Sequence, residues 1–184
     1  MAQSPSNNIE FRRIFDDHFV EVQRYCARRL GQEEANDAVS EVFLVAWRRL
    51  GEVPRGDAAL PWLIGVARNA VRNAGRSRRR AGRLAVRAQL ADDQVTPGPE
   101  VQVVQKAEYR EVADALESLS DADREVIRLR TWEELTAPQI ASVLGISLSA
   151  AEKRMARSMA RLERAIERRR TSTRPRAIRK GGDA

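Results

Sequence analysis

Apolar residues recur every three to four positions through most of this chain, which is the spacing of amphipathic helices. The segments with this spacing cover residues 9–30, 33–50, 62 onward into an arginine-rich stretch, 101–119, 122–132 and 136–168. Gly31 and Gly51 directly follow the first two segments, and glycine commonly ends helices. No segment alternates polar and apolar residues as a strand does, and no internal repeat occurs. The pattern therefore predicts an all-α protein.

The inward-facing positions of the first three helices predict an apolar core. These positions are Phe11, Phe15, Phe19, Val22, Cys26, Leu30, Val39, Val42, Phe43, Ala46, Leu50, Leu63, Val66, Ala67 and Ala70. Cys26 is the only cysteine, so no disulfide is predicted, and its place on the apolar side of a helix predicts a buried thiol rather than a redox sensor or nucleophile. The outer face of the third helix carries Arg68, Arg72, Arg76 and Arg79.

A polar, proline-containing stretch divides the helices into two small domains. Residues 89–104 contain two prolines and a glycine without sustained periodicity, which is typical of a flexible linker. The sequence therefore predicts domains at residues 9–88 and 105–170, a disordered start at residues 1–8 and a mobile basic tail at residues 171–184. Neither domain can bury a large core alone, so partner binding is expected to contribute to their order.

The last two predicted helices form a helix-turn-helix pattern. Thr136 and Gln139 fit a capping box, Pro138 suits a first helical turn, and Gly145 supplies the turn between the helices. The second helix is predicted to place inward Ala151, Met155, Met159, Leu162 and Ile166, and outward Lys153, Arg157, Arg161, Arg164 and Arg168. Major-groove readers use this order of elements. We interpret the segment as a DNA reader; the alternative is an amphipathic surface helix with a solvated charged side.

The composition narrows the function classes. The 184 residues carry a formal net charge of +7, which favours nucleic acid or an acidic protein surface over a small neutral substrate. One histidine, His18, one cysteine, no phosphate-binding glycine loop and no metal-ligand cluster predict no enzyme activity, no metal site and no cofactor. The N-terminus has no apolar signal core, and no run approaches membrane-spanning length. We therefore expect a cytoplasmic protein without membrane insertion.

Three stretches carry a family resemblance. They are, in order, EEANDAVSEVFLVAWRRL, PWLIGVARNAVRNAGRSRRR and LESLSDADREVIRLRTWEELTAPQIASVLGISLSAAEKRMARSMARLER. Over residues 11–80 and 101–166 the chain resembles a bacterial RNA polymerase sigma factor of the extracytoplasmic-function (ECF) group. The resemblance implies an N-terminal domain that opens and reads the minus-ten promoter element, and a C-terminal domain that reads the minus-thirty-five element. It also implies binding to core RNA polymerase, mainly the clamp of the largest subunit and also the flap, and an anti-sigma factor as a further partner.

The second helix carries the residues that the resemblance assigns to polymerase docking. Asp37, Glu41 and Arg48 share a helix face with Leu44, which makes a mixed acidic and apolar strip. In the family, positions like these dock on the clamp helices. From the residues alone, an acidic face that solvates an otherwise basic domain explains the strip equally well.

The loop at residues 51–61 and the helix after it resemble the family's minus-ten reader. Melting a duplex requires a pocket for an unstacked base and cationic groups for the displaced backbone. The residues expected to contact minus-ten DNA are Arg55, Asp57, Trp62, Arg68, Asn69, Arg72 and Arg76. The arginines of the helix suit phosphate contacts, and Asn69 matches the position beside the flipped base, with a solvated side chain as the alternative.

Two apolar residues of this region bear on melting. Trp62 could stack on nucleic acid, but a packed position in the core is favoured. Many relatives have an aromatic residue where this chain has Ile64, so stacking during melting is expected to be weaker. Promoter opening should then depend on a close sequence match. In the linker, Asp92, Asp93 and Glu100 could mimic phosphates inside the polymerase, and a solvated tether explains them equally well.

The helix-turn-helix departs from the family at one position. The residues expected to contact minus-thirty-five DNA are Ser149, Glu152, Lys153, Arg154, Arg157 and Arg161. Relatives commonly carry a lysine where this chain has Glu152. Glu152 could accept a hydrogen bond from a cytosine, repel a phosphate or complete a capping box with Ser149, and we favour the cap. A stand-alone helix-turn-helix regulator is the alternative function, but it would not need the strip around Asp37 and Glu41.

Overall fold

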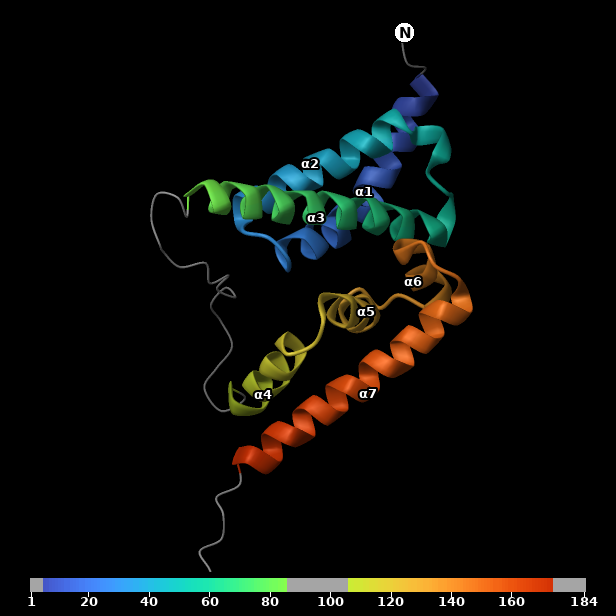
Figure 1. Cartoon of the computed structure of the whole chain (residues 1–184). Coiled ribbons are helices and arrows are strands. Elements are labelled where there is room, and N and C mark those ends of the chain that lie inside the picture. The colour runs from blue at the N-terminus through green and yellow to red at the C-terminus, as the bar shows by residue number, and fades with distance from the viewer. Residues whose placement is uncertain (1–4, 86–105, 174–184) are drawn as a thin grey trace, which may run out of the picture.

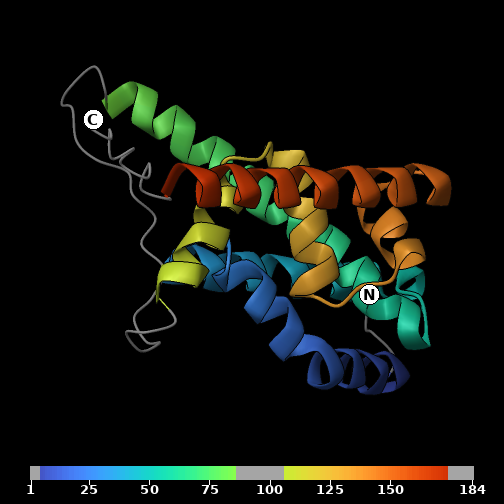
Figure 2. The ribbon, with the colours of Figure 1, turned by 90° about the horizontal axis from the view of Figure 1, so that it is seen from below.

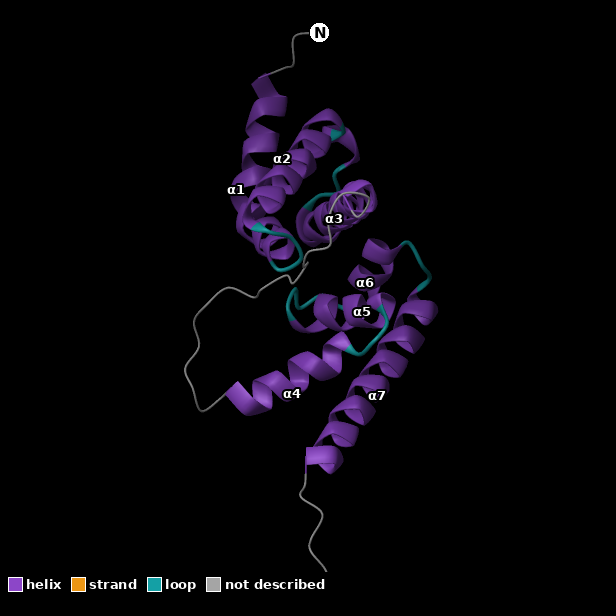
Figure 3. Cartoon of the chain, turned by 60° about the vertical axis from the view of Figure 1, so that its left-hand side comes forward, coloured by secondary structure: helices purple, strands orange, loops and turns teal. Residues whose placement is uncertain are grey.

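The structure, a computed structural model, describes residues 5–85 and 106–173 (Figure 1, Figure 3). The N-terminal unit contains α1 (Pro5–Ala27), α2 (Gln32–Arg48), the short 3-10 segments η1 (Leu50–Glu52) and η2 (Gly56–Ala58), and α3 (Ala59–Ala85). The C-terminal unit contains α4 (Lys106–Glu117), α5 (Asp121–Thr131), α6 (Ala137–Leu144) and α7 (Leu148–Thr173). No strand occurs in these two ranges, in agreement with the all-α prediction.

Several helix boundaries differ from the sequence prediction. Residues 5–8, predicted to be disordered, belong to α1. Helix α3 begins at Ala59 rather than near Trp62, because Pro61 fits a first helical turn, where its missing N–H costs no hydrogen bond. Helix α7 continues to Thr173, into the predicted tail. The rest of that tail, and the predicted linker with Asp92, Asp93 and Glu100, lie outside the described residues.

Aromatic side chains join α1 to α2. The ring centroids of Phe15 and Phe43 lie 4.6 Å apart, and those of Phe11 and Trp47 lie 4.9 Å apart with their planes at 75°, arrangements that aromatic pairs prefer. Cys26, farther along α1, is fully buried, and burial raises the pKa of its thiol to about 11. This confirms the predicted buried thiol, which is protonated at neutral pH.

The C-terminal unit has the predicted helix-turn-helix, formed by α6 and α7. The carboxamide oxygen of Gln139 accepts a hydrogen bond from the backbone N–H of Thr136 at 2.8 Å, as the capping box requires. Gly145 ends α6 with φ at +64°, a left-handed conformation that glycine adopts without steric cost. These local contacts confirm the predicted helix-turn-helix.

The start of α7 corrects two predictions. Ser147 caps the helix, since its Oγ accepts the backbone N–H of Ala150 at 3.2 Å. Ser149 therefore lies inside the helix, and the capping box predicted for Ser149 and Glu152 is wrong. Met159, predicted to face inward, is 38% exposed, while its neighbour Ser158 is fully buried. The other predicted inward positions, Ala151, Met155, Leu162 and Ile166, are buried or partly buried, so the prediction is wrong only at Met159.

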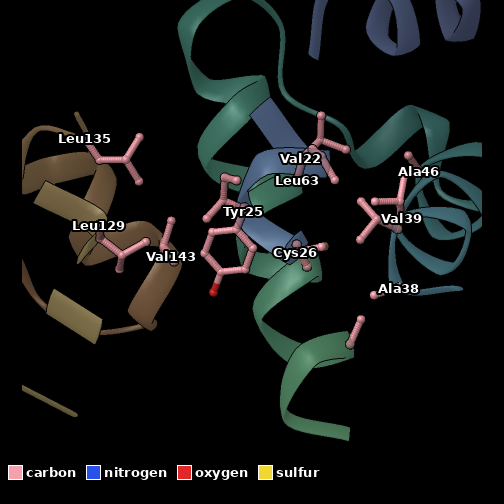
Figure 4. Packing of buried hydrophobic residues seen from close by; sticks show 14 of the residues in the cluster. Val22, Tyr25, Cys26, Ala38, Val39, Ala46, Leu63, Leu129, Leu135 and Val143 are labelled. Carbon is pink, nitrogen blue, oxygen red and sulfur yellow. The ribbon is translucent and has the colours of Figure 1, made fainter. Parts of the chain in front are cut away.

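The two units pack against each other and share one apolar core. Figure 4 shows Tyr25 of the N-terminal unit next to Val143 of the C-terminal unit, and both belong to one cluster of buried residues with Leu63 and Leu129. The contact runs mainly between α3 and α6 (Figure 1). A Cβ on Gly65 would lie 3.9 Å from the Cα of Val143, so the two helix backbones come close at this glycine. Each unit thus buries apolar side chains of the other unit that would otherwise contact water.

A smaller second core holds the rest of the C-terminal unit together. It consists of Ala115, Ile127, Leu162 and Ala165, contributed by α4, α5 and α7. Helix α7 therefore contacts α4, α5 and α6 along its length (Figure 2).

Candidate nucleic-acid and polymerase interfaces

Helix α2 presents the predicted docking strip to solvent. Asp37, Glu41, Leu44 and Arg48 are all exposed, and the apolar side chain of Leu44 is 46% exposed. The opposite face of α2, with Val39, Val42, Phe43 and Ala46 among its buried residues, packs into the shared core. We call the four exposed residues the docking strip. The structure thus brings together all four of the side chains that the sequence assigned to polymerase binding.

Helix α3 presents most of its predicted DNA-contacting residues along one side. Asn69, Arg72 and Arg76 are exposed, and Arg68 is half-buried. Arg76 donates a hydrogen bond to the Oδ1 of Asn73 at 2.5 Å. Arg68 and Arg72 have no hydrogen-bond or ion-pair partner among the described residues. Their guanidinium groups are therefore available to an anionic ligand.

Two apolar residues of α3 lie in or against the core. Trp62 is half-buried and packs on the shared core, in agreement with the packed position favoured from sequence. Ile64 is 1% exposed and lies under the C-terminal unit. In this arrangement neither side chain stands free to stack on a base.

The predicted loop residues lie next to the contact between the units. Arg55 is exposed, with its Nε 3.7 Å from an Oε1 of Glu10. The backbone oxygen of Asp57 accepts a hydrogen bond from Nε2 of Gln139 at 3.4 Å, which links η2 to α6. The Asp57 side chain is exposed.

The predicted minus-thirty-five residues in the first turns of α7 differ in their exposure to solvent. Glu152, Lys153 and Arg157 are exposed, and the Nε of Arg157 donates to the backbone oxygen of Lys153 at 3.1 Å. Arg154 is half-buried and points into a cavity that it shares with Arg68 of α3. The two predicted promoter-reading surfaces therefore meet at this cavity.

Arg161 is tied to α5. It donates a hydrogen bond of 2.5 Å to Asp123, which also accepts from Ser158 and Ser120, each at 2.7 Å. Burial alone would raise the pKa of Asp123, but these hydrogen bonds from Ser158, Ser120 and Arg161 outweigh burial and lower the pKa. This network fixes α7 against the start of α5, a contact that does not follow from the sequence pattern.

A charge cluster with a buried centre joins α1 to the C-terminal unit. The guanidinium of Arg29 donates to Glu133 at 2.8 Å and to Glu125 at 3.2 Å, and the hydroxyl of Tyr25 donates to Glu125 at 2.8 Å. Arg28 donates to the second oxygen of Glu133 at 2.8 Å. We call these five residues the interdomain clasp. The side chains of Arg29 and Glu133 are each only 5% exposed, so solvent screens their attraction little.

The electrostatics of the clasp favour the charged pair. Burial alone would lower the pKa of Arg29, but the facing groups Tyr25, Glu125 and Glu133 outweigh burial and raise it. Burial also raises the pKa of Tyr25, so its hydroxyl stays a hydrogen-bond donor. The guanidinium lies 3.6 Å above the centroid of the Tyr25 ring, a cation–π arrangement. The sequence pattern does not reveal the clasp, because its partners lie 96 to 105 residues apart.

The comparison with known proteins assigns both units. The family model described as Sigma-70 region 2 matches residues 14–81, and the model described as Sigma-70, region 4 matches residues 109–162. The RNA polymerase sigma factor CnrH of Cupriavidus metallidurans is 31% identical over 178 residues, which cover 90% of this chain and 92% of that protein. The chain belongs to the ECF family of RNA polymerase sigma factors. It is an alternative sigma factor, a transcription initiation factor rather than a stand-alone regulator.

Other relatives and solved structures agree with this family. The ECF sigma factor SigL of Mycobacterium tuberculosis is 31% identical over 148 residues, which cover 78% of this sigma factor and 81% of SigL. The fold is similar to that of RpoE from Bartonella quintana in complex with the anti-sigma factor NepR, with a TM-score of 0.63 and 18% identity over 85% of this chain and 96% of that chain. It is also similar to CnrH in complex with the cytosolic domain of CnrY, with a TM-score of 0.56 and 23% identity over 86% and 88% of the chains.

Among the described residues, no helix is both long enough and apolar enough to span a bilayer.

Proposed function

We propose that this sigma factor docks on the polymerase clamp through the docking strip of α2 and reads promoter DNA with α3 and α7. The observation that carries the proposal is that one small unit exposes an acidic and apolar strip on α2 and a basic face on α3. A basic face supplies phosphate contacts, whereas the strip offers a protein partner an apolar centre with charges around it. A DNA-binding module alone would not need both surfaces.

Reading two separate promoter elements requires the units to move apart. In the structure the two units are packed together, which we call the closed arrangement, and Arg68 of α3 and Arg154 of α7 line the same cavity. Each unit therefore covers part of the surface with which the other unit is proposed to contact DNA. We infer that polymerase or promoter binding opens the clasp. Arg161, held by Asp123, is then a residue that positions α7, while Lys153, Arg154 and Arg157 contact DNA.

Reconstitution with bacterial core polymerase tests the proposal directly. The full chain is expected to direct core polymerase to a defined set of promoters, seen by sequencing transcript starts on a library of promoter fragments. Starts that do not change when the chain is added would contradict it. Because promoters and polymerase lie in the bacterial cytoplasm, the proposal places the protein there.

The phosphate contacts of α3 predict a change in salt dependence. In open-complex formation, the binding constant falls as the salt concentration rises. Replacing Arg68, Arg72 or Arg76 by alanine should in each case make the slope of log binding constant against log salt concentration shallower by up to about 0.9, because each lost contact releases one fewer counterion. Arg12→Ala on α1, also exposed, is the matched control and should leave the slope unchanged. If all three α3 variants keep the parent slope, this face does not hold DNA.

Within α7, alanine substitutions of the early and the late arginines should affect DNA binding differently. Alanine at Arg154 or Arg157 should cost about 1 to 3 kcal/mol against the preferred minus-thirty-five sequence and relax the choice at one or two base pairs. Alanine at Arg164, which is exposed farther along the helix, should weaken all sequences alike. Selection from randomised minus-thirty-five sites measures the difference. Equal preferences in all variants would mean that α7 positions the domain without reading bases.

An anti-sigma factor is the further partner that we propose. RpoE of Bartonella quintana was solved with the anti-sigma factor NepR, and the present chain shares its fold. The exposed docking strip would be covered by such a partner if inhibitor and polymerase compete. In a pull-down, the parent protein should then retain both the anti-sigma factor and core polymerase, and a docking-strip variant should lose both.

A further inference from the structure

A cavity of about 580 Å³ lies between the two units, where α3 passes α5 and the start of α7. Its walls are rich in arginine, with contributions from α1, α3, α5 and α7. The seven arginines are Arg29, Arg68, Arg72, Arg76, Arg124, Arg128 and Arg154, whereas the carboxylates are only Asp121 and Glu125. Side chains that line this arginine cavity therefore carry a formal charge of +5.

Contacts inside the protein satisfy only some of these arginines. Arg29 is paired in the clasp, and Arg124 donates to the backbone oxygens at the end of α4 and in the turn after it. Arg68, Arg72 and Arg154 have no hydrogen-bond or ion-pair partner among the described residues. These three free guanidinium groups come from both units, so the cavity has free donors on two sides.

Arg128 shows that the closed arrangement leaves a positive group poorly compensated. Its Nε is buried and has no hydrogen-bond acceptor in the described structure. Burial lowers its pKa, and the neighbouring charges of Arg29 and Arg124 lower it further, against the opposite effect of Glu125 and Glu117. Its guanidinium also lies 5.0 Å from the centroid of the Trp132 ring. A buried donor without a partner and like charges at close range both cost free energy. An anion in the cavity would relieve both costs.

We propose that the arginine cavity binds a small polyphosphate anion, which holds the two units in the closed arrangement. Guanidinium groups bind phosphate oxygens through paired, charge-assisted hydrogen bonds, and a phosphate chain supplies several negative charges to match the excess of arginine. The volume lies in the range of small-molecule sites. Leu30, Val71 and Leu144 line the same cavity and leave an apolar surface for an uncharged part of a ligand such as a nucleoside.

The closed arrangement selects a small anion over promoter DNA. The walls come from both units, and the proposed promoter complex needs these units apart. If the proposed function holds, a bound polyphosphate withholds Arg68, Arg72 and Arg154 from DNA and keeps the sigma factor inactive. Binding itself does not depend on that function, because the cavity exists in the protein alone.

Calorimetric titration of the full chain with inorganic tripolyphosphate and with adenosine triphosphate tests the site. We expect one binding event per chain. Glutamine at Arg68, Arg128 or Arg154 should each weaken tripolyphosphate binding about tenfold, since each removes one charge-assisted contact. Arg12→Gln and Arg164→Gln make the same change of net charge at exposed positions outside the cavity and should leave affinity nearly unchanged.

A second measurement follows closure. Dyes on Ser40→Cys of α2 and Glu163→Cys of α7, both exposed positions, report the distance between the units by energy transfer. The buried Cys26, with a pKa of about 11, should not react with the dyes. Tripolyphosphate is expected to raise energy transfer in the parent protein and to do so less in the Arg128→Gln variant.

The outcomes separate the alternatives. Equal affinity for the two ligands would show that the phosphate chain alone is recognised, and tighter binding of the nucleotide would show that the apolar wall contributes. The proposal is overturned by the absence of saturable binding, by an equal loss in the control variants, by a loss confined to variants of one unit, or by binding that leaves energy transfer unchanged. All measurements use the protein without polymerase or DNA, so a failure of the proposed function would leave their result intact.

Discussion

Replacing Arg29 by methionine is expected to release the C-terminal unit from the N-terminal unit. The substitution removes the buried cation that Glu133 and Glu125 share, and leaves Glu133, itself 5% exposed, with Arg28 at 2.8 Å as its remaining cation. Removing one partner of a buried pair costs about 3 to 5 kcal/mol when the other charge is left unpaired, and the contact with Arg28 reduces that cost. Separation of the units returns Glu133 and Glu125 to water, so we expect the protein to open rather than unfold. The ratio of closed to open molecules should fall about tenfold or more.

Energy transfer between dyes on α2 and α7 measures this opening, and circular dichroism verifies that the helices remain. Glu133→Gln removes the other side of the pair and should open the protein in the same direction. Arg12→Met, on the same helix but exposed, is the matched control. Promoter DNA should bind Arg29→Met more tightly than the parent, because less free energy is spent on opening. Unchanged energy transfer in both clasp variants would show that the clasp does not hold the units together.

Reversing the charges of Asp37 and Glu41 to lysine should weaken binding to core polymerase by about tenfold or more, because like charges placed across an interface cost several kcal/mol. Both side chains are exposed on α2, so the fold and the melting temperature of the isolated protein should change little. The measurement is the affinity of labelled sigma factor for core polymerase in the absence of DNA.

The control for charge is the pair Asp16→Lys and Asp17→Lys on α1. Both positions are exposed, and the change of net charge equals that of the docking-strip variant. Loss of affinity in the docking-strip variant alone supports clamp docking by α2. Equal loss in both variants would mean that polymerase responds only to net charge, and unchanged affinity in the docking-strip variant would contradict the assigned role.

The sequence was sufficient for features that depend on neighbouring residues. Helix periodicity, the hydrogen bond between Thr136 and Gln139, and the left-handed glycine at Gly145 all depend on contacts within a few positions, so they follow from local spacing. The start of α7 shows where such reasoning fails. Ser147 and Ser149 both have a side-chain hydroxyl that can cap the N-terminus of a helix. The turn after Gly145 places Ser147, and not Ser149, at the N-terminus of α7.

The partners of the charged residues required the tertiary structure. Arg161 was expected to face DNA because it lies on the outer side of an amphipathic helix, yet it is held by Asp123, 38 residues earlier. Arg154, which belongs to the same basic helix, lies in the arginine cavity opposite Arg68. The sequence shows that a helix carries an arginine, but it does not show whether that arginine pairs with another part of the protein or remains available to DNA.

The sequence by itself determined the helices, the basic faces of α3 and α7, the exposed docking strip and the resemblance to sigma factors, which the family comparison confirmed. The tertiary structure alone decided that the two units share a core, that Arg29 joins Glu125 and Glu133, and that unpaired arginines of both units surround one cavity. The physical reason is range. Amphipathic periodicity is set by contacts four residues apart, whereas burial and charge pairing between units depend on residues about a hundred positions apart.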